Sequence, residues 1–177
     1  MQDLIRRYET VFWIDADALI VDLGRDVISE LDGDFDVYLA HHVQAEPAGA
    51  VVPNFGVVIL RQSEYTSGML DRLWSSTEFI DHNWWENAAL MPILGYSPDP
   101  PWPHLGDTAD SPHFGPLGLA WNSVPRACED PHPAIRHHAR ADDRSFETRL
   151  AGMTADLQAV VASAAWAAAA RSRRRLV

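Results

Sequence analysis

Residues 11–22 read VFWIDADALIVD, a run of β-forming residues that reaches two aspartates and then turns apolar again. The pattern predicts a buried strand over residues 10–15. Asp15 and Asp17 project together if the strand continues, and around one corner if it ends there. Because burying an unpaired carboxylate costs several kcal/mol, we expect a compensating partner beside this pair.

The composition indicates a single globular domain with an acidic surface. The chain has 177 residues, 47% of them hydrophobic, and a formal net charge of −11. Nucleic acid is therefore not an expected partner, because phosphate binding needs a basic surface. All 14 basic residues are arginines, which excludes a lysine Schiff base or a P-loop lysine. The single cysteine, Cys128, excludes an internal disulfide, and no segment is long enough for a transmembrane helix, so we expect a cytoplasmic protein.

Strands and helices alternate along the chain, which predicts an α/β fold with a mixed sheet flanked by helices. The expected strands cover residues 10–15, 35–42, 54–61 and 135–138, and the expected helices cover residues 3–9, 24–31, 63–76, 83–94 and 145–171. Ser63 and Asn83 are the predicted N-caps. Residues 95–118 are rich in proline and glycine and predict a long irregular loop. The apolar residues at helical spacing include Trp74 in the third helix and, in the last, Phe146, Leu150, Met153, Leu157 and Val160.

The aspartate pair is typical of a site for a divalent cation. Two neighbouring carboxylates repel each other unless a cation lies between them. Mn²⁺ and Mg²⁺ prefer oxygen ligands and keep positions open for phosphate oxygens. Asp15 and Asp17 therefore indicate a metal that bridges to a substrate diphosphate, and a solvated turn at the strand end is the alternative.

A second class of enzymes carries the same pair of aspartates after an apolar strand. Phosphatases of the haloacid dehalogenase class also carry D-x-D after an apolar strand. They continue to a threonine or valine and use a distal lysine or arginine, whereas this chain has Leu19 at that position and no lysine. The phosphatase interpretation is therefore weaker than that of a metal site for a substrate diphosphate.

Three more segments add side chains that suit a sugar and a metal. Asn54 and Gly56 stand at the expected start of a buried strand, where glycine permits close approach of a ligand and asparagine can bond sugar hydroxyls. Residues 82–90 read HNWWENAAL, and residues 135–139 read IRHHA. Each has a structural alternative: Asn54 and Gly56 as turn residues, one of the tryptophans as core, and the histidines as surface residues.

Together these segments resemble the galactosyltransferase and mannosyltransferase family of GT-A fold enzymes, glycosyltransferase family thirty-four, which includes plant xyloglucan xylosyltransferases. The resemblance covers residues 8 to 155 and rests on the order of the parts. Those parts are Asp15-Ala16-Asp17, Asn54-Phe55-Gly56 with Arg61, Trp85-Glu86-Asn87-Ala88, Trp121-Asn122-Ser123-Val124-Pro125 and His137.

The resemblance implies a retaining glycosyltransferase that uses Mn²⁺, or Mg²⁺, to move a sugar from a nucleotide-sugar donor to a carbohydrate or another hydroxyl acceptor. Asp17 would bind the metal, Asp15 the metal or the donor ribose, and His137 would be the third ligand, with His138 as its alternative. The implied catalytic residues are Glu86 and Asn87. The implied substrate-binding residues are Asn54, Gly56, Trp85, Trp121 and Asn122.

The resemblance also implies a division of the chain. Residues 1–155 would form a partial, Rossmann-like GT-A domain and residues 156–177 a C-terminal helix rich in alanine and arginine. Only ten residues precede Val11, fewer than one parallel crossover needs. We therefore expect the first nucleotide-binding strands to be missing and an unpaired edge beside residues 10–15. A non-catalytic remnant that acts as a binding module is the alternative function.

Overall fold

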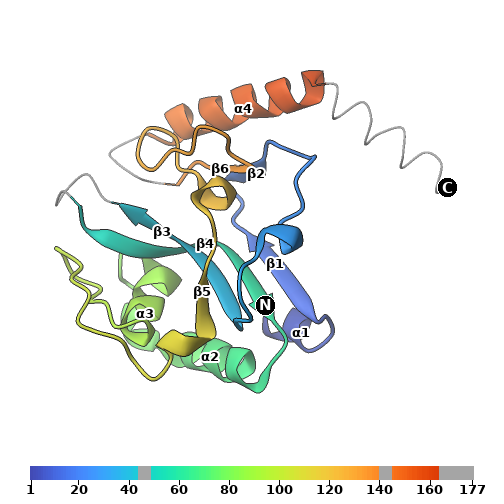
Figure 1. The fold of residues 1–177 in the computed structure, drawn as a ribbon. Coiled ribbons are helices and arrows are strands. Elements are labelled where there is room, and N and C mark those ends of the chain that lie inside the picture. Colours follow the sequence, from blue (N-terminus) through green and yellow to red (C-terminus); the bar gives the residue numbers. More distant parts are fainter. Residues whose placement is uncertain (44–48, 140–144, 164–177) are drawn as a thin grey trace. The chain divides into compact units, whose positions relative to one another are not determined.

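The computed structural model describes residues 1–43, 49–139 and 145–163. These residues fall into two compact units, both drawn in Figure 1. The first unit comprises Met1–Ile14 and Leu31–Gly118, and the second comprises Asp15–Glu30 and Leu119–Val177.

The first unit contains the expected mixed sheet flanked by helices. Its four strands follow the order β1-β4-β3-β5. β1 pairs antiparallel with β4, β3 pairs antiparallel with β4, and β5 runs parallel to β3. The strands span Thr10–Ile14 (β1), Val37–Val43 (β3), Val51–Arg61 (β4) and Phe114–Pro116 (β5).

The edge of this sheet lies where the sequence predicts it. Among the described strands, β1 pairs with β4 alone and ends the strand order. The strand is only half-buried, with Val11 as its one buried residue, so the expectation of a buried strand here is wrong in part. The apolar run from Val57 to Leu60 in β4 is fully buried, as expected for a strand covered on both faces.

Helices pack against the sheet around one hydrophobic core. They are α1 (Gln2–Ile5), α2 (Glu64–Ser75) and α3 (Trp85–Ile93), with the short 3₁₀ helices η2 (Thr77–Phe79) and η3 (Ser111–His113). α2 begins at its predicted cap, because the Ser63 side chain accepts a hydrogen bond from the Thr66 N–H at 3.0 Å. The core joins side chains of α1, β1, β3, β4, α2 and α3 and of the residue that follows α3: Ile5, Val11, Val37, Leu39, Phe55, Val58, Leu60, Met69, Leu70, Leu90 and Leu94.

Three predictions about this unit are wrong. Asn83 does not cap α3, which begins after Trp84 and has no side-chain cap. The predicted loop over residues 95–118 contains β5, because pairing with β3 completes the sheet at that edge. Trp74 is 83% exposed, although it follows the buried Leu70 by one helical turn, because it stands at the C-terminal end of α2, one residue before the helix ends at Ser75.

The second unit is built on a small sheet and one long helix. β2 (Ala18–Ile20) pairs antiparallel with β6 (Ile135–His137). The helix α4 (Phe146–Ala162) begins at Ser145, whose side chain accepts from the Thr148 N–H. Two 3₁₀ helices complete the unit, η1 (Ile28–Glu30) and η4 (Leu119–Asn122).

The second unit departs from two expectations. The helix predicted over 24–31 is reduced to the single turn η1. The apolar stripe of α4 is mostly exposed, with Phe146 at 65% and Leu150 and Leu157 at 50% each, while Val160 is buried.

The predicted separate helix over 156–177 begins inside α4, and its part from residue 164 onward lies outside the described residues. No helix in the described ranges combines the length and the hydropathy of a membrane span.

Candidate metal centre

The two aspartates lie around a tight turn rather than along one strand. β1 ends at Ile14, and the Ala18 N–H donates to the Asp15 carbonyl oxygen at 3.0 Å before β2 begins. Of the two alternatives open from the sequence, the corner is therefore the one observed. A turn that starts at Asp15 leaves both carboxylates on the same short segment.

The register of the small sheet brings a histidine to this turn. Ala18 pairs with His137 across β2 and β6. The His138 N–H donates to the Asp17 carbonyl oxygen at 2.8 Å, which extends the pairing into the turn. His137 is thereby placed beside two carboxylates that lie about 120 positions earlier in the sequence.

Asp15, Asp17 and His137 form a cluster with the donor set of a divalent cation. One ligand atom from each residue lies within 4.8 Å of the others. His137 Nε2 is 3.3 Å from Asp17 Oδ1 and 4.0 Å from Asp15 Oδ2. The histidine is buried, whereas the two aspartate side chains are about one-third exposed. The two carboxylates therefore remain accessible from solvent.

Asn122 fixes the orientation of the histidine ring. Its Oδ1 lies 2.8 Å from His137 Nδ1, and both side chains are buried. With a carbonyl oxygen as acceptor, Nδ1 carries the hydrogen, and Nε2 presents its lone pair to the carboxylates. A hydrogen-bonded outer partner of this kind is the usual support of a metal-ligating histidine.

The cluster needs a positive charge between its members. In the neutral ring, the Nε2 lone pair would face an anionic oxygen at 3.3 Å, so either a proton or a metal ion belongs between them. When a proton occupies Nε2, the hydrogen bond from His137 holds the pKa of Asp17 below its ordinary value, and the charges of His137 and Arg149 act in the same direction. Two carboxylate oxygens and one imidazole nitrogen suit Mn²⁺ and related divalent ions.

Arg149 of α4 contacts the same aspartate from the other side. Its Nη1 lies 3.2 Å from Asp17 Oδ2 and 3.4 Å from the His138 carbonyl oxygen. Asp17 thus presents one oxygen to His137 and the other to Arg149.

His138 points away from the cluster, toward α4. Its Nε2 lies 2.9 Å from Asp156 Oδ2, and the other oxygen of Asp156 accepts from Arg136 at 3.2 Å. A Cβ at Gly152 would meet the His138 ring at 2.9 Å, so the glycine lets α4 approach this closely. His138 therefore joins α4 to β6, and it is His137 whose ring faces the aspartates.

Three predicted site residues of the first unit lie at a bulge. The pairing of β3 with β4 shifts register between Leu39 and Ala40, which leaves part of β4 without ladder partners from β3. Asn87 Oδ1 accepts from the Phe55 N–H at 2.9 Å, and its Nδ2 donates to the Pro53 carbonyl oxygen at 3.1 Å. Asn54 Oδ1 accepts from the Gly56 N–H at 2.9 Å. These contacts stabilise the bulge, and the roles of Asn54, Gly56 and Asn87 toward a substrate stay predictions.

The first turn of α3 carries an exposed tryptophan and an exposed carboxylate. Trp85 is 64% exposed and has a φ of +41°, a left-handed conformation that a bulky residue rarely adopts. Trp84 stacks on Trp102 with a ring separation of 4.8 Å, so it is the packed member of the pair. Glu86 follows on the surface. The catalytic role of Glu86 stays a prediction.

Trp121, a further predicted substrate residue, lies inside the second unit. It is 4% exposed, its Nε1 donates to Glu30 Oε2 at 3.0 Å, and the Arg25 guanidinium lies over its ring. Arg25 also pairs with Glu30. The ring is therefore embedded in a structural network, and its contact with a sugar stays a prediction.

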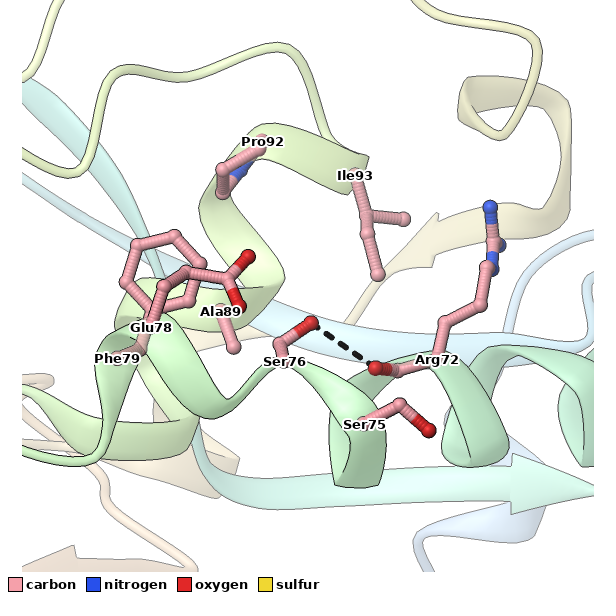
Figure 2. A pocket seen from close by; sticks show the side chains of 8 residues that line it. All are labelled: Arg72, Ser75, Ser76, Glu78, Phe79, Ala89, Pro92 and Ile93. Carbon is pink, nitrogen blue, oxygen red and sulfur yellow. Dashed lines mark hydrogen bonds between the residues drawn. The ribbon is translucent and has the colours of Figure 1, made fainter.

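A separate hollow opens in the first unit, where α2, η2 and α3 meet (Figure 2). Its volume is about 380 Å³, and Figure 2 labels its lining: Arg72, Ser75, Ser76, Glu78, Phe79, Ala89, Pro92 and Ile93. Both serine hydroxyls donate to carbonyl oxygens of α2, and Arg72 is bound to Asp110. These polar groups are therefore engaged in contacts that hold the fold.

Two neighbours of the site, Arg149 and Asp156, were not predicted from the sequence. Both lie in α4, which was interpreted only through its apolar stripe. The informative signal is the polar set Arg149, Gly152 and Asp156, spaced so that it shares one helical face.

No family model, no curated protein and no solved structure matches this chain. The functional interpretation therefore rests on the residues and on their geometry.

Proposed function

We propose that the chain is a metal-dependent glycosyltransferase of the GT-A type, in which Asp15, Asp17 and His137 bind Mn²⁺ or Mg²⁺ and thereby the diphosphate of a nucleotide-sugar donor. The observation that carries this proposal is the convergence of the three ligand atoms within 4.8 Å. The order of the sequence motifs, from the aspartate pair to the late histidine, supports the sugar-transfer chemistry.

The chain's residues take distinct parts in the proposed reaction. The bond from the sugar C1 to the donor phosphate oxygen breaks, and a bond to the acceptor hydroxyl oxygen forms, with retention at C1. The nucleoside diphosphate leaves, and its phosphate oxygen takes the proton of the acceptor hydroxyl. A bound divalent ion would supply Lewis-acid stabilisation of the diphosphate as its charge develops. Asn122 keeps His137 in the tautomer that can bind that ion, and Asp17 is held in place through its backbone by His138.

The proposed roles of the first unit concern the sugars. Trp85 offers an exposed aromatic face of the kind on which sugar rings stack, and Glu86 would orient donor or acceptor hydroxyls. The exposure of both side chains leaves them accessible to a ligand, which supports this assignment.

Metal binding is tested first, by thermal unfolding of the full chain and of the variants Asp17→Asn and His137→Gln with and without Mn²⁺. At a Mn²⁺ concentration 100 times the dissociation constant, binding stabilises the folded state by about 2.7 kcal/mol. That corresponds to a rise in melting temperature of about 5–10 °C for a chain of this size. Both variants should lose this rise.

Asp22→Asn is the matched control, because Asp22 lies outside the cluster and an asparagine oxygen can still accept from the Gly24 N–H. A wild-type chain whose melting temperature does not respond to Mn²⁺ would remove the basis of the proposal. Transfer is then tested by incubating the chain with nucleotide sugars and Mn²⁺ and measuring released nucleoside diphosphate. Mn²⁺ binding without such release, and without binding of nucleotide sugars, would favour the binding-module alternative.

A further inference from the structure

Arg149 divides the two oxygens of Asp17 between two partners. Oδ1 lies 3.3 Å from His137 Nε2, inside the ligand cluster, and Oδ2 lies 3.2 Å from Arg149 Nη1. The same Nη1 is 3.4 Å from the His138 carbonyl oxygen. The guanidinium therefore contacts the turn and the end of β6 together, on the side of Asp17 away from the imidazole.

The helix that carries Arg149 is anchored within the second unit (Figure 1). Asp156, two turns further along α4, accepts hydrogen bonds from Arg136 and His138 of the small sheet. Gly152 lies between them against the His138 ring. The Arg149 side chain is only 22% exposed. Its contact with Asp17 is thus part of a packed helix face rather than a loose surface ion pair.

We propose that Arg149 sets the metal selectivity of the Asp15–Asp17–His137 site by holding Asp17 as a one-oxygen ligand. This inference rests on the proposed metal site. A carboxylate whose second oxygen is bound to a guanidinium cannot also give that oxygen to the metal without losing the ion pair. The site then offers the metal one oxygen of Asp17, the carboxylate of Asp15 and the imidazole nitrogen of His137.

Small and large divalent ions respond differently to such a site. Ca²⁺ takes six to eight oxygen ligands and often binds carboxylates through both oxygens, whereas Mg²⁺ keeps an octahedral shell. Mn²⁺ also accepts an imidazole nitrogen. Arg149 therefore favours Mn²⁺ over Ca²⁺.

The positive charge of Arg149 has a separate effect that the test must distinguish. A nearby guanidinium repels every divalent cation, so its removal raises the affinities for Mn²⁺ and Ca²⁺ by the same factor. Loss of the hold on Oδ2 instead changes the ratio of the two affinities, because only Ca²⁺ gains from a second oxygen. The ratio is the diagnostic quantity.

The experiment measures the dissociation constants of Mn²⁺ and Ca²⁺ by titration calorimetry of the full chain. Arg149→Met keeps the aliphatic packing and removes the hydrogen bonds, and we expect the preference for Mn²⁺ over Ca²⁺ to fall by about tenfold, the scale of outer-shell effects on metal sites. Arg149→Lys keeps a donor and the charge, and should retain most of the preference. Arg126→Gln removes an exposed arginine of the same unit and should leave the ratio unchanged.

Two results would overturn the inference. If Arg149→Met changes both affinities by one common factor, Arg149 acts through charge alone. If the wild type binds no Mn²⁺, the metal site itself is wrong and the inference falls with it. Should Arg149→Met not fold, as judged by circular dichroism, Arg149→Gln undergoes the same comparison with the same two criteria.

Discussion

Asn122 Oδ1 lies 2.8 Å from His137 Nδ1, and the two buried side chains form a contact that holds the imidazole with Nε2 toward Asp17 and Asp15. Asn122 was expected to bind substrate. That role stays a prediction, and in the structure its amide supports the ring of the candidate ligand from the Nδ1 side.

The first prediction concerns this amide. Asn122→Ala should weaken Mn²⁺ binding by about tenfold or more, because the ring loses the partner that fixes its tautomer. The buried Nδ1–H is also left without its acceptor, which lowers the free energy of unfolding by about 1–3 kcal/mol. Calorimetric titration and urea unfolding measure the two effects. Asn83→Ala, at an exposed asparagine, is the control, and an unchanged Mn²⁺ affinity in Asn122→Ala would contradict the assigned role.

The second prediction concerns the close approach of α4. Gly152→Ala places a Cβ at 2.9 Å from His138 Cε1 and 3.0 Å from Nδ1. The resulting overpacking should cost about 1–3 kcal/mol and outweigh the gain of about 1 kcal/mol that alanine brings to a helix. Gly68→Ala in α2 is the matched control, since a Cβ there meets nothing within 4 Å. Urea unfolding should show opposite signs for the two variants, and stabilisation by both would show that His138 does not limit the packing.

The third prediction concerns the pair formed by Arg72 and Asp110 in the first unit. The Arg72 guanidinium donates to both carboxylate oxygens, at 2.6 and 3.1 Å, and holds the pKa of Asp110 below its ordinary value of 3.8. A depressed pKa means that the contribution to stability is complete above the unfolded-state pKa and is lost as the pH falls through the folded-state pKa.

Asp110→Asn should therefore lower the free energy of unfolding by about 1 kcal/mol at pH 7, as expected for a partly exposed two-point ion pair. The difference from wild type should shrink as the pH falls below 3.8. Urea unfolding across the pH range measures it, with Asp81→Asn at an exposed aspartate as the control. A difference that stays constant down to the acid limit would contradict the assignment to this carboxylate.

The fourth prediction concerns Glu86, the acidic residue in the first turn of α3. If it orients sugar hydroxyls, Glu86→Gln should reduce the release of nucleoside diphosphate by about 100-fold, the lower range for a positioned carboxylate. The melting temperature should hardly change. Glu64→Gln is the matched control, because Glu64 stands in the first turn of α2 and experiences the same kind of helix dipole. Equal turnover in wild type and Glu86→Gln would leave Glu86 with a structural role only.

The sequence alone determined the elements whose signals are local. The continuous apolar run of β4 and the capping serine of α2 are properties of neighbouring residues, and both are present as predicted. The D-x-D pair and the late histidine indicated the ligand set, and the structure brings Asp15, Asp17 and His137 within reach of one another. Their grouping came from a family resemblance, because no local pattern links positions so far apart.

Only the tertiary structure decided what surrounds that ligand set. Arg149 meets Asp17 across 132 positions, and Asn122 meets His137 because η4 runs beside β6. Residues 114–116 form the strand β5 because they pair with the edge of β3. The contacts of α4 come from the polar face of Arg149, Gly152 and Asp156 and, of its apolar stripe, mainly from the buried Val160. These outcomes depend on which surfaces meet after folding, and side-chain periodicity gives the faces of an element without identifying the partner that each face will contact.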